Sequence, residues 1–215
     1  MDFATLEWVF STDRLQPYLA FYKGDQKKAT LHYQANLKIS ESFYTVLSLF
    51  EVALRNSLNR ELSKLFGTHD WYLHLHQLNA LDRTINRAKN QILKRDEVVS
   101  SAKVIAELTP GFWISLFNAE YERTLWKDLR RAFPFLEKRE RQRHRVSVPL
   151  NRIRNFRNRV YHNEPIAWNM QSLELIHNEI MEVLGWINRQ LPEYAQSLSR
   201  FPTVLQTIKE ELEIK

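Results

Sequence analysis

Apolar side chains in residues 40–65 recur at every third or fourth position, which is the spacing of one buried helix face. Ser40 precedes this stripe and suits a helix N-cap, and Gly67 follows it and suits a helix stop. We therefore expect a helix over about residues 40–65. The stripe consists of Phe43, Leu47, Phe50, Leu54, Leu58, Leu62 and Leu65.

A second stripe of the same spacing ends before Pro192 and consists of Leu173, Ile176, Ile180, Val183, Ile187 and Leu191. No segment alternates apolar and polar residues convincingly enough to predict a strand. The sequence therefore predicts an all-α protein, built as a bundle of antiparallel helices with additional helices. Weaker helical patterns cover roughly 12–23, 78–95, 112–132, 147–163 and 203–214.

The length of 215 residues and the absence of a Gly/Ser linker favour a single domain over 1–215. Four Gly and seven Pro give few turn signals, which favours long helices. We expect an N-terminal helical extension over 1–39, core helices over 40–190 and a C-terminal helical tail over 191–215.

Composition excludes several classes of protein. Cysteine is absent, which rules out disulfides and thiolate zinc sites. The N-terminal sequence "MDFATLEWVF" lacks the basic start of a signal peptide. No uncharged apolar run reaches the ~18 residues of a membrane span. We expect a soluble, cytoplasmic protein without a membrane partner.

Positive charge is concentrated in one segment. The formal net charge is +6, and residues 123–159 contain 13 Lys or Arg against three acids. Such a segment is typical of a surface for a polyanion, and equally of a solvated charged face. Charge alone leaves both interpretations open.

The end of this basic segment reads "NRIRNFRNRVYHNEPI", residues 151–166. Pro165 disfavours helical angles at the residue before it, so we expect the helix to end near His162. Asn158 and His162 are four residues apart and share one side of that helix. The side chain of Arg157 is long enough to reach either flank. The inward positions are Leu150, Ile153, Phe156 and Val160.

Arg and His together suit the metal-free cleavage of RNA by its own 2′-hydroxyl. The reaction needs a base, an acid and a cation that stabilises the phosphorane-like transition state. His transfers protons, Arg forks onto two phosphate oxygens, and Asn orients either group. Because one motif supplies one His, two copies meeting at a symmetric dimer would supply both proton-transfer groups. The alternative is a solvated basic helix whose His is only a cap.

A polar row on the long predicted helix contains Glu51, Arg55 and Asn59 at intervals of four. Glu51 before Arg55 is the favourable order for an ion pair within a helix. The row gains a functional meaning only if it faces the motif in space.

The other candidate functional sites have weaker support in the sequence. His74 and His76 lack a third metal ligand in view, so we expect no metal and no cofactor. No glycine-rich phosphate loop is present. The aromatic side chains of Trp113, Trp126 and Phe133 alternate with basic residues and suit base stacking, although core packing is the commoner role.

The string "RNRVYH" matches the Arg-Asn-x-x-x-His motif of the HEPN superfamily, and the whole chain resembles its Abi-like (abortive infection) branch. The resemblance implies an all-helical HEPN fold, a homodimer, and a metal-independent endoribonuclease that acts as a toxin in phage defence. The segments that carry the resemblance are "ESFYTVLSLFEVALRNSLNRELSKLFG" (41–67), "VIAELTPGFWISLF" (104–117), "LWKDLRRAFP" (125–134), "IRNFRNRVYHNEPI" (153–166) and "IMEVLGWINRQLPEY" (180–194).

The resemblance also implies residue roles. The catalytic set is Arg157, Asn158 and His162, and the "EVALRN" segment gives Glu51, Arg55 and Asn56 as supports. Relatives commonly read His-His-Glu-Pro where this chain has "HNEP", so Asn163 stands in place of a second His. We expect RNA contacts from Arg152, Arg154, Arg159 and Asn163.

The implied partners are RNA, a second copy of the chain and an antitoxin, either a protein or a small RNA. The alternative is a non-catalytic HEPN module that binds RNA or a protein partner through the same surface.

Overall fold

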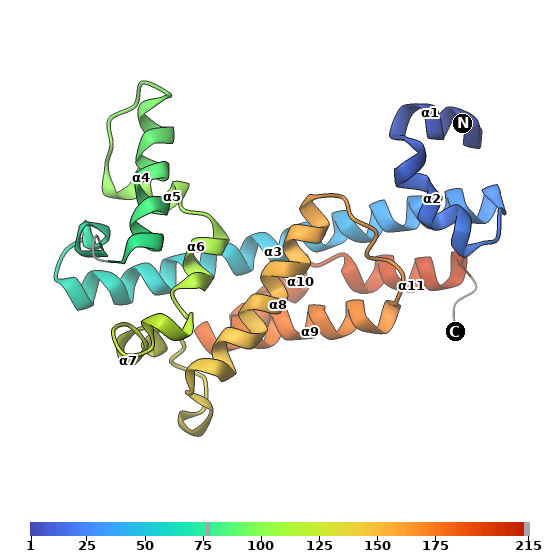
Figure 1. Cartoon of the computed structure of the whole chain (residues 1–215). Helices are drawn as coiled ribbons and strands as arrows, with labels where there is room; N and C mark the ends of the chain where they lie inside the picture. Colours follow the sequence, from blue (N-terminus) through green and yellow to red (C-terminus); the bar gives the residue numbers. More distant parts are fainter. Residues whose placement is uncertain (76–77, 213–215) are drawn as a thin grey trace.

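The computed structural model describes residues 1–75 and 78–212, and every regular element in these residues is helical (Figure 1). The predicted all-α class is therefore confirmed. The α-helices are α1 (Phe3–Phe10), α2 (Thr12–Phe21), α3 (Gln26–Phe66), α4 (Asn79–Leu93), α5 (Ser101–Glu107), α6 (Pro110–Ser115), α7 (Trp126–Leu129), α8 (Arg143–Tyr161), α9 (Met170–Ile187), α10 (Leu191–Leu198) and α11 (Phe201–Glu211). Short 3₁₀ helices are η1 (Trp71–Leu75), η2 (Ala119–Tyr121), η3 (Arg130–Ala132) and η4 (Lys138–Glu140).

Helix α3 is the element on which most others pack, and it is 41 residues long. The carboxylate of Asp25 caps its start by accepting a hydrogen bond from the backbone N–H of Lys28 (3.1 Å). Gly67 ends it in the left-handed conformation, with φ of 66°, which confirms the predicted stop.

The predicted start at Ser40 is wrong, because Ser40 lies in the interior of α3. The buried face of the first half of α3 includes His32 and Asn36, which interrupt the apolar periodicity that the prediction followed. The hydroxyl of Ser40 caps nothing and has no hydrogen-bond partner among the described atoms.

Three further helices pack around α3 and enclose the main core. Helix α9 runs in the same direction as α3, α11 runs in the opposite direction, and α8 crosses them obliquely (Figure 1). Phe43 joins these layers, because its ring packs against Phe156 of α8 (4.6 Å between centroids) and Phe201 of α11 (4.3 Å). The predicted inward residues of α8 are all buried: Leu150, Ile153, Phe156 and Val160.

A second, smaller core lies at the N-terminal end of α3, where α1 and α2 pack against it. The expected boundary between residues 39 and 40 falls inside α3, so one continuous helix serves both cores. At the other boundary, Leu191 begins α10 and does not extend the preceding helix, because α9 ends at Ile187. The small core consists of Phe3, Leu6, Leu15, Tyr18, Ala29 and Tyr33.

The single helix predicted over 112–132 is wrong. The chain there forms α6, η2, α7 and η3 in succession. Residues such as Phe117, Tyr121 and Leu125 keep a four-residue spacing and are buried, which explains the helical pattern. The helix is nevertheless interrupted after α6, and the carbonyl of Phe117 accepts a hydrogen bond from the guanidinium of Arg143 (2.9 Å). A tertiary contact thus satisfies a group that a continuous helix would have satisfied.

Helices α4 and α5 project together beyond the C-terminal half of α3, away from the α9–α11 layer (Figure 1). None of the described helices is both long and apolar enough to cross a membrane.

Two buried histidines make the stability of the helix packing depend on pH. Burial lowers the pKa of His32 and of His177 below the ordinary value. The Nε2–H of His32 donates to the carbonyl of Ala167 (2.8 Å), and its Nδ1 accepts from the hydroxyl of Tyr22 (3.2 Å). The neutral imidazole is therefore fully hydrogen-bonded, and its protonation opposes folding.

We expect the melting temperature to fall as the pH is lowered from about 7.5 to about 5, measured by circular dichroism. Because the folded-state pKa of each His is lowered, the unfolded chain binds more protons in this window, so stability is complete above about pH 6.5 and decreases below it. His32→Gln keeps a donor for Ala167 without a titrating group and should weaken this dependence. His144→Gln, at an exposed position, should leave it unchanged. A melting temperature that is constant across this range would contradict the assignment.

Candidate functional site

The candidate site lies at the C-terminal end of α8. His162 is the C-cap, as the sequence predicted, and its backbone N–H bonds the carbonyl of Asn158 (2.9 Å). The side chains of Asn158 and His162 are both exposed. Neither makes a hydrogen bond or ion pair with any part of the chain that the structure describes. Two polar side chains one helical turn apart therefore face solvent.

Arg157 is held in place by two groups. Its Nε donates to the carboxylate Oε1 of Glu51 on α3 (2.7 Å), and its guanidinium lies 3.9 Å from the ring centroid of Tyr161. About a quarter of its side chain is exposed (24%). Its two terminal nitrogens donate no hydrogen bond to a described residue. The edge of the guanidinium that forks onto phosphate oxygens is thus available.

Glu51 therefore faces the motif from α3. Its carboxylate bonds Arg157, whereas Arg55 donates a long hydrogen bond to the side chain of its neighbour Asn56 (3.4 Å). The alternative Glu51–Arg55 ion pair does not form at 4.0 Å or less in the described structure. Asn59, the last member of the polar row, accepts a hydrogen bond from the indole of Trp71 (2.7 Å) and so supports the fold.

A cleft of about 260 Å³ opens beside this pair, between α3, the end of α8 and the α5–α6 connection. Tyr161 forms one wall, and Tyr44 of α3 packs near it, with 6.0 Å between ring centroids. Burial, and secondarily the charge of Glu51, raises the pKa of the Tyr161 phenol, which therefore stays neutral at ordinary pH. The lining residues are Tyr44, Ser48, Glu51, Val52, Arg55, Ala106, Glu107, Leu108, Thr109, Pro110, Trp113 and Tyr161.

The turn after His162 has the hydrogen bonds of a Schellman motif. Asn163 has a φ of 53°, its N–H bonds the carbonyl of Val160 (3.1 Å), and the N–H of Glu164 bonds the carbonyl of Arg159 (2.9 Å). Asn tolerates the left-handed conformation better than most residues. The carbonyl of Asn163 also accepts from Arg14 of α2 (2.6 Å). Asn163 thus has a structural role in ending α8.

Two of the arginines expected to contact RNA are engaged within the chain. Arg159 donates to the carboxylate of Glu164 (3.2 Å) and to the carbonyl of Pro165 (2.7 Å), so it holds the same turn. Arg152 makes a two-pronged ion pair with Glu179 of α9. Both line the hollow between α8 and α9, away from the cleft of Tyr161. Arg154 makes only a long contact with Asn155 (3.5 Å).

The loop after the motif is fixed by a buried residue that the sequence analysis did not single out. The side-chain oxygen of Asn36 on α3 accepts from the N–H groups of Ile166 (2.7 Å) and Ala167 (3.0 Å). Its amide donates to the carbonyl of Glu164 (3.3 Å). The sequence signal for Asn36 was a polar residue at a position of the buried helix face where an apolar residue is expected.

Much of the basic segment 123–159 is neutralised within the fold. Arg143, for example, pairs with Glu122, and Arg157 pairs with Glu51. The segment is therefore a less exposed positive surface than its charge count indicates. Seven of its arginines lie within 4.0 Å of a described carboxylate: Arg131, Arg139, Arg143, Arg145, Arg152, Arg157 and Arg159.

The remaining candidates have packing roles or stay open. Trp113 and Phe133 are buried, and Trp126 packs partly buried against the core, so core packing accounts for them. His74 stacks on Phe66 (5.1 Å between centroids), and His76 lies outside the described residues. Within residues 1–75 and 78–212, no group of three or more His, Asp or Glu side chains is placed to hold a metal ion.

Comparisons of the chain with protein-family models, with curated proteins and with solved structures gave no match.

We expect Asn36→Ala to lower the free energy of unfolding by about 2–3 kcal/mol, because it leaves the buried N–H groups of Ile166 and Ala167 without an acceptor. Urea denaturation of the two proteins measures this difference. The matched control, Asn155→Ala at an exposed position of α8, should stay within about 0.5 kcal/mol of the parent. Equal effects of the two substitutions would contradict the role given to Asn36.

Proposed function

We propose that this protein is a metal-independent endoribonuclease of the HEPN type, acting in the cytoplasm as an abortive-infection toxin. One observation carries the proposal: Arg157 is held by Glu51 and Tyr161 with its terminal nitrogens available, at the same end of α8 as the exposed side chains of Asn158 and His162. Phosphodiester cleavage needs both a charged fork for the phosphate and a proton-transfer group, and this end of α8 carries one of each. The resemblance of the wider sequence to Abi-like proteins supports the same function.

In the proposed reaction, the ribose 2′-oxygen attacks the adjacent phosphorus, and the bond to the 5′-oxygen of the next nucleotide breaks. The proton of the 2′-hydroxyl passes to a base, and an acid delivers a proton to the departing 5′-oxygen. The products are a 2′,3′-cyclic phosphate and a 5′-hydroxyl. His162 serves one of the proton transfers, Asn158 orients the phosphate or the imidazole, and Arg157 stabilises the negative charge of the phosphorane.

Glu51 acts in this proposal as a positioning residue. Because its carboxylate occupies only Nε of Arg157, a phosphate can bind the opposite edge through both terminal nitrogens. The ring of Tyr161 packs against one face of the guanidinium and restricts its movement. Little side-chain entropy is therefore lost when the phosphate binds.

A second copy of the chain would supply the second proton-transfer group, as the single motif histidine requires. Exposed apolar residues lie on α3 close to the motif: Tyr44 and Val52 line the cleft, and Leu37 lies further along the helix. This face suits a homodimer that brings two His162 side chains together. An antitoxin, protein or small RNA, completes the proposed set of partners.

We expect the purified protein to cleave single-stranded RNA in the presence of EDTA and to leave 2′,3′-cyclic phosphate ends. His162→Ala and Arg157→Ala should each lower the rate by about 100-fold or more, because each removes a group used in the transition state. Gel electrophoresis of end-labelled RNA measures the rate, and mass spectrometry identifies the ends.

The controls are His144→Ala and Arg145→Ala, exposed positions in the first turn of the same helix, which should cleave like the parent. Cleavage that stops with EDTA, or that persists in His162→Ala, would refute the mechanism. RNA binding without any cleavage would instead identify a non-catalytic RNA-binding module. For the toxin role, expression of the parent should arrest bacterial growth, and expression of the two motif variants at equal yield should not.

We expect Val52→Glu to weaken self-association, because it places a charge on the exposed face of α3 beside the cleft. Sedimentation velocity measures the dimer fraction, and RNA cleavage should fall with it. Val98→Glu makes the same change at an exposed position between α4 and α5 and should leave both unchanged. A parent protein that is monomeric while it cleaves RNA would overturn the composite site.

A further inference from the structure

Helix α4 presents an unusually polar outer face. Its apolar residues Leu81, Ile85, Ala88 and Ile92 are buried at intervals of three or four and hold it against the rest of the protein. The opposite side lines an open hollow of about 730 Å³. Except for Leu93, the residues around that hollow carry hydrogen-bond donors: Arg83, Asn86, Arg87, Asn90, Gln91 and Lys94.

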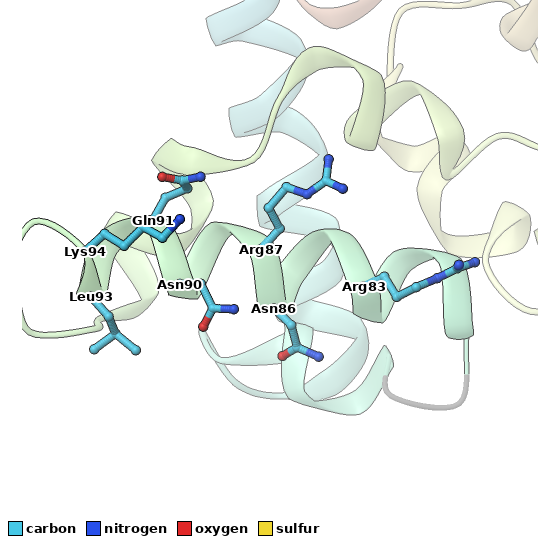
Figure 2. Close-up of a pocket in the computed structure, with 7 residues that line it drawn as sticks. All are labelled: Arg83, Asn86, Arg87, Asn90, Gln91, Leu93 and Lys94. Atoms are coloured by element: carbon cyan, nitrogen blue, oxygen red, sulfur yellow. The ribbon is translucent and has the colours of Figure 1, made fainter.

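These side chains form two parallel rows. Arg87, Gln91 and Lys94 extend on one side of α4 in Figure 2, and Asn86, Asn90 and Leu93 extend on the other. Arg83 stands one turn before Arg87 and continues the first row toward the start of the helix. One row is therefore mainly cationic, and the other is mainly amide.

Arg87 and Lys94 differ from most arginines of the basic segment in their partners. Arg87 and Lys94 are exposed, and neither has a carboxylate within 4.0 Å in the parts of the chain that the structure describes. Most arginines of 123–159, by contrast, are paired. A binding partner with negative charge would thus meet the full positive charges of Arg87 and Lys94 without first breaking an ion pair.

The row from Arg83 to Lys94 is about 16 Å long at the rise of an α-helix, which spans several nucleotides of a stacked strand. Amide side chains beside such a row suit hydrogen bonds to base edges and to ribose hydroxyls. Helix α4 packs on α5, and residues just after α5 line the cleft next to Tyr161. Helix α4 thus belongs to the part of the fold that borders the candidate site.

We infer that the outer face of α4 is a second RNA-binding surface, which holds the single-stranded substrate through its phosphates outside the site of cleavage. The inference rests on the proposed function for its choice of RNA, but it concerns residues that the motif does not include.

The test measures binding of a fluorescent single-stranded RNA of about 20 nucleotides by anisotropy, at several salt concentrations between about 50 and 200 mM. All proteins carry His162→Ala, so that the RNA stays intact. Arg87→Ala with Lys94→Ala should weaken binding about tenfold and lower the slope of log affinity against log salt by about 1.4, or about 0.7 for each phosphate contact.

The matched control removes two exposed lysines from the far end of the molecule, Lys27→Ala with Lys28→Ala in the first turn of α3, and should bind like the parent. Equal losses in the two double variants, or no loss in either, would overturn the inference. An equal loss on a DNA strand of the same sequence would overturn the assignment to RNA. If the unaltered protein cleaves RNA and the α4 double variant binds RNA normally, the α4 inference is refuted and the proposed function stands. If the unaltered protein neither binds nor cleaves RNA, both are refuted.

Discussion

The ion pair between Glu51 and Arg157 is the contact that sets the arrangement of side chains at the end of α8. It joins two helices through residues that are 106 positions apart in the sequence. It also fixes the direction of the Arg157 side chain, which could otherwise lie on either flank of α8. Without it, Arg157 would be one more exposed arginine in a basic helix. With it, a guanidinium, a neutral phenol and two exposed polar side chains occupy one end of one helix.

The local parts of this arrangement could be read from the sequence. The inward residues of α8 follow from steps of three and four, and its end at His162 follows from Pro165. The direction of Arg157 could not be read, because it depends on a partner from another helix. Asn36 was missed for a related reason. A polar residue on the apolar face marks the position, but its partners are in a loop more than a hundred residues later, which the local pattern does not identify.

The count of charged residues in the sequence was the least reliable guide to where an exposed positive surface lies. A count of basic residues says nothing about where the matching acids lie in space, and in this fold Glu51, Glu122 and Glu179 come from outside the basic segment to pair with it. Arg87 and Lys94, which are exposed and have no carboxylate within 4.0 Å among the described residues, lie outside that segment. Burial and pairing, which require the three-dimensional structure, decide which charges another molecule can meet.

Asn163 shows how backbone geometry restricts sequence change next to His162. Its left-handed conformation disfavours β-branched and bulky residues, whereas Gly, Asn, Asp and His adopt such angles more readily. An exchange between Asn and His at this position therefore leaves the turn intact, and with it the direction in which the chain leaves His162. The shape of the main chain thus limits which residue types fit at this position, and the side chain can supply chemistry only within that set.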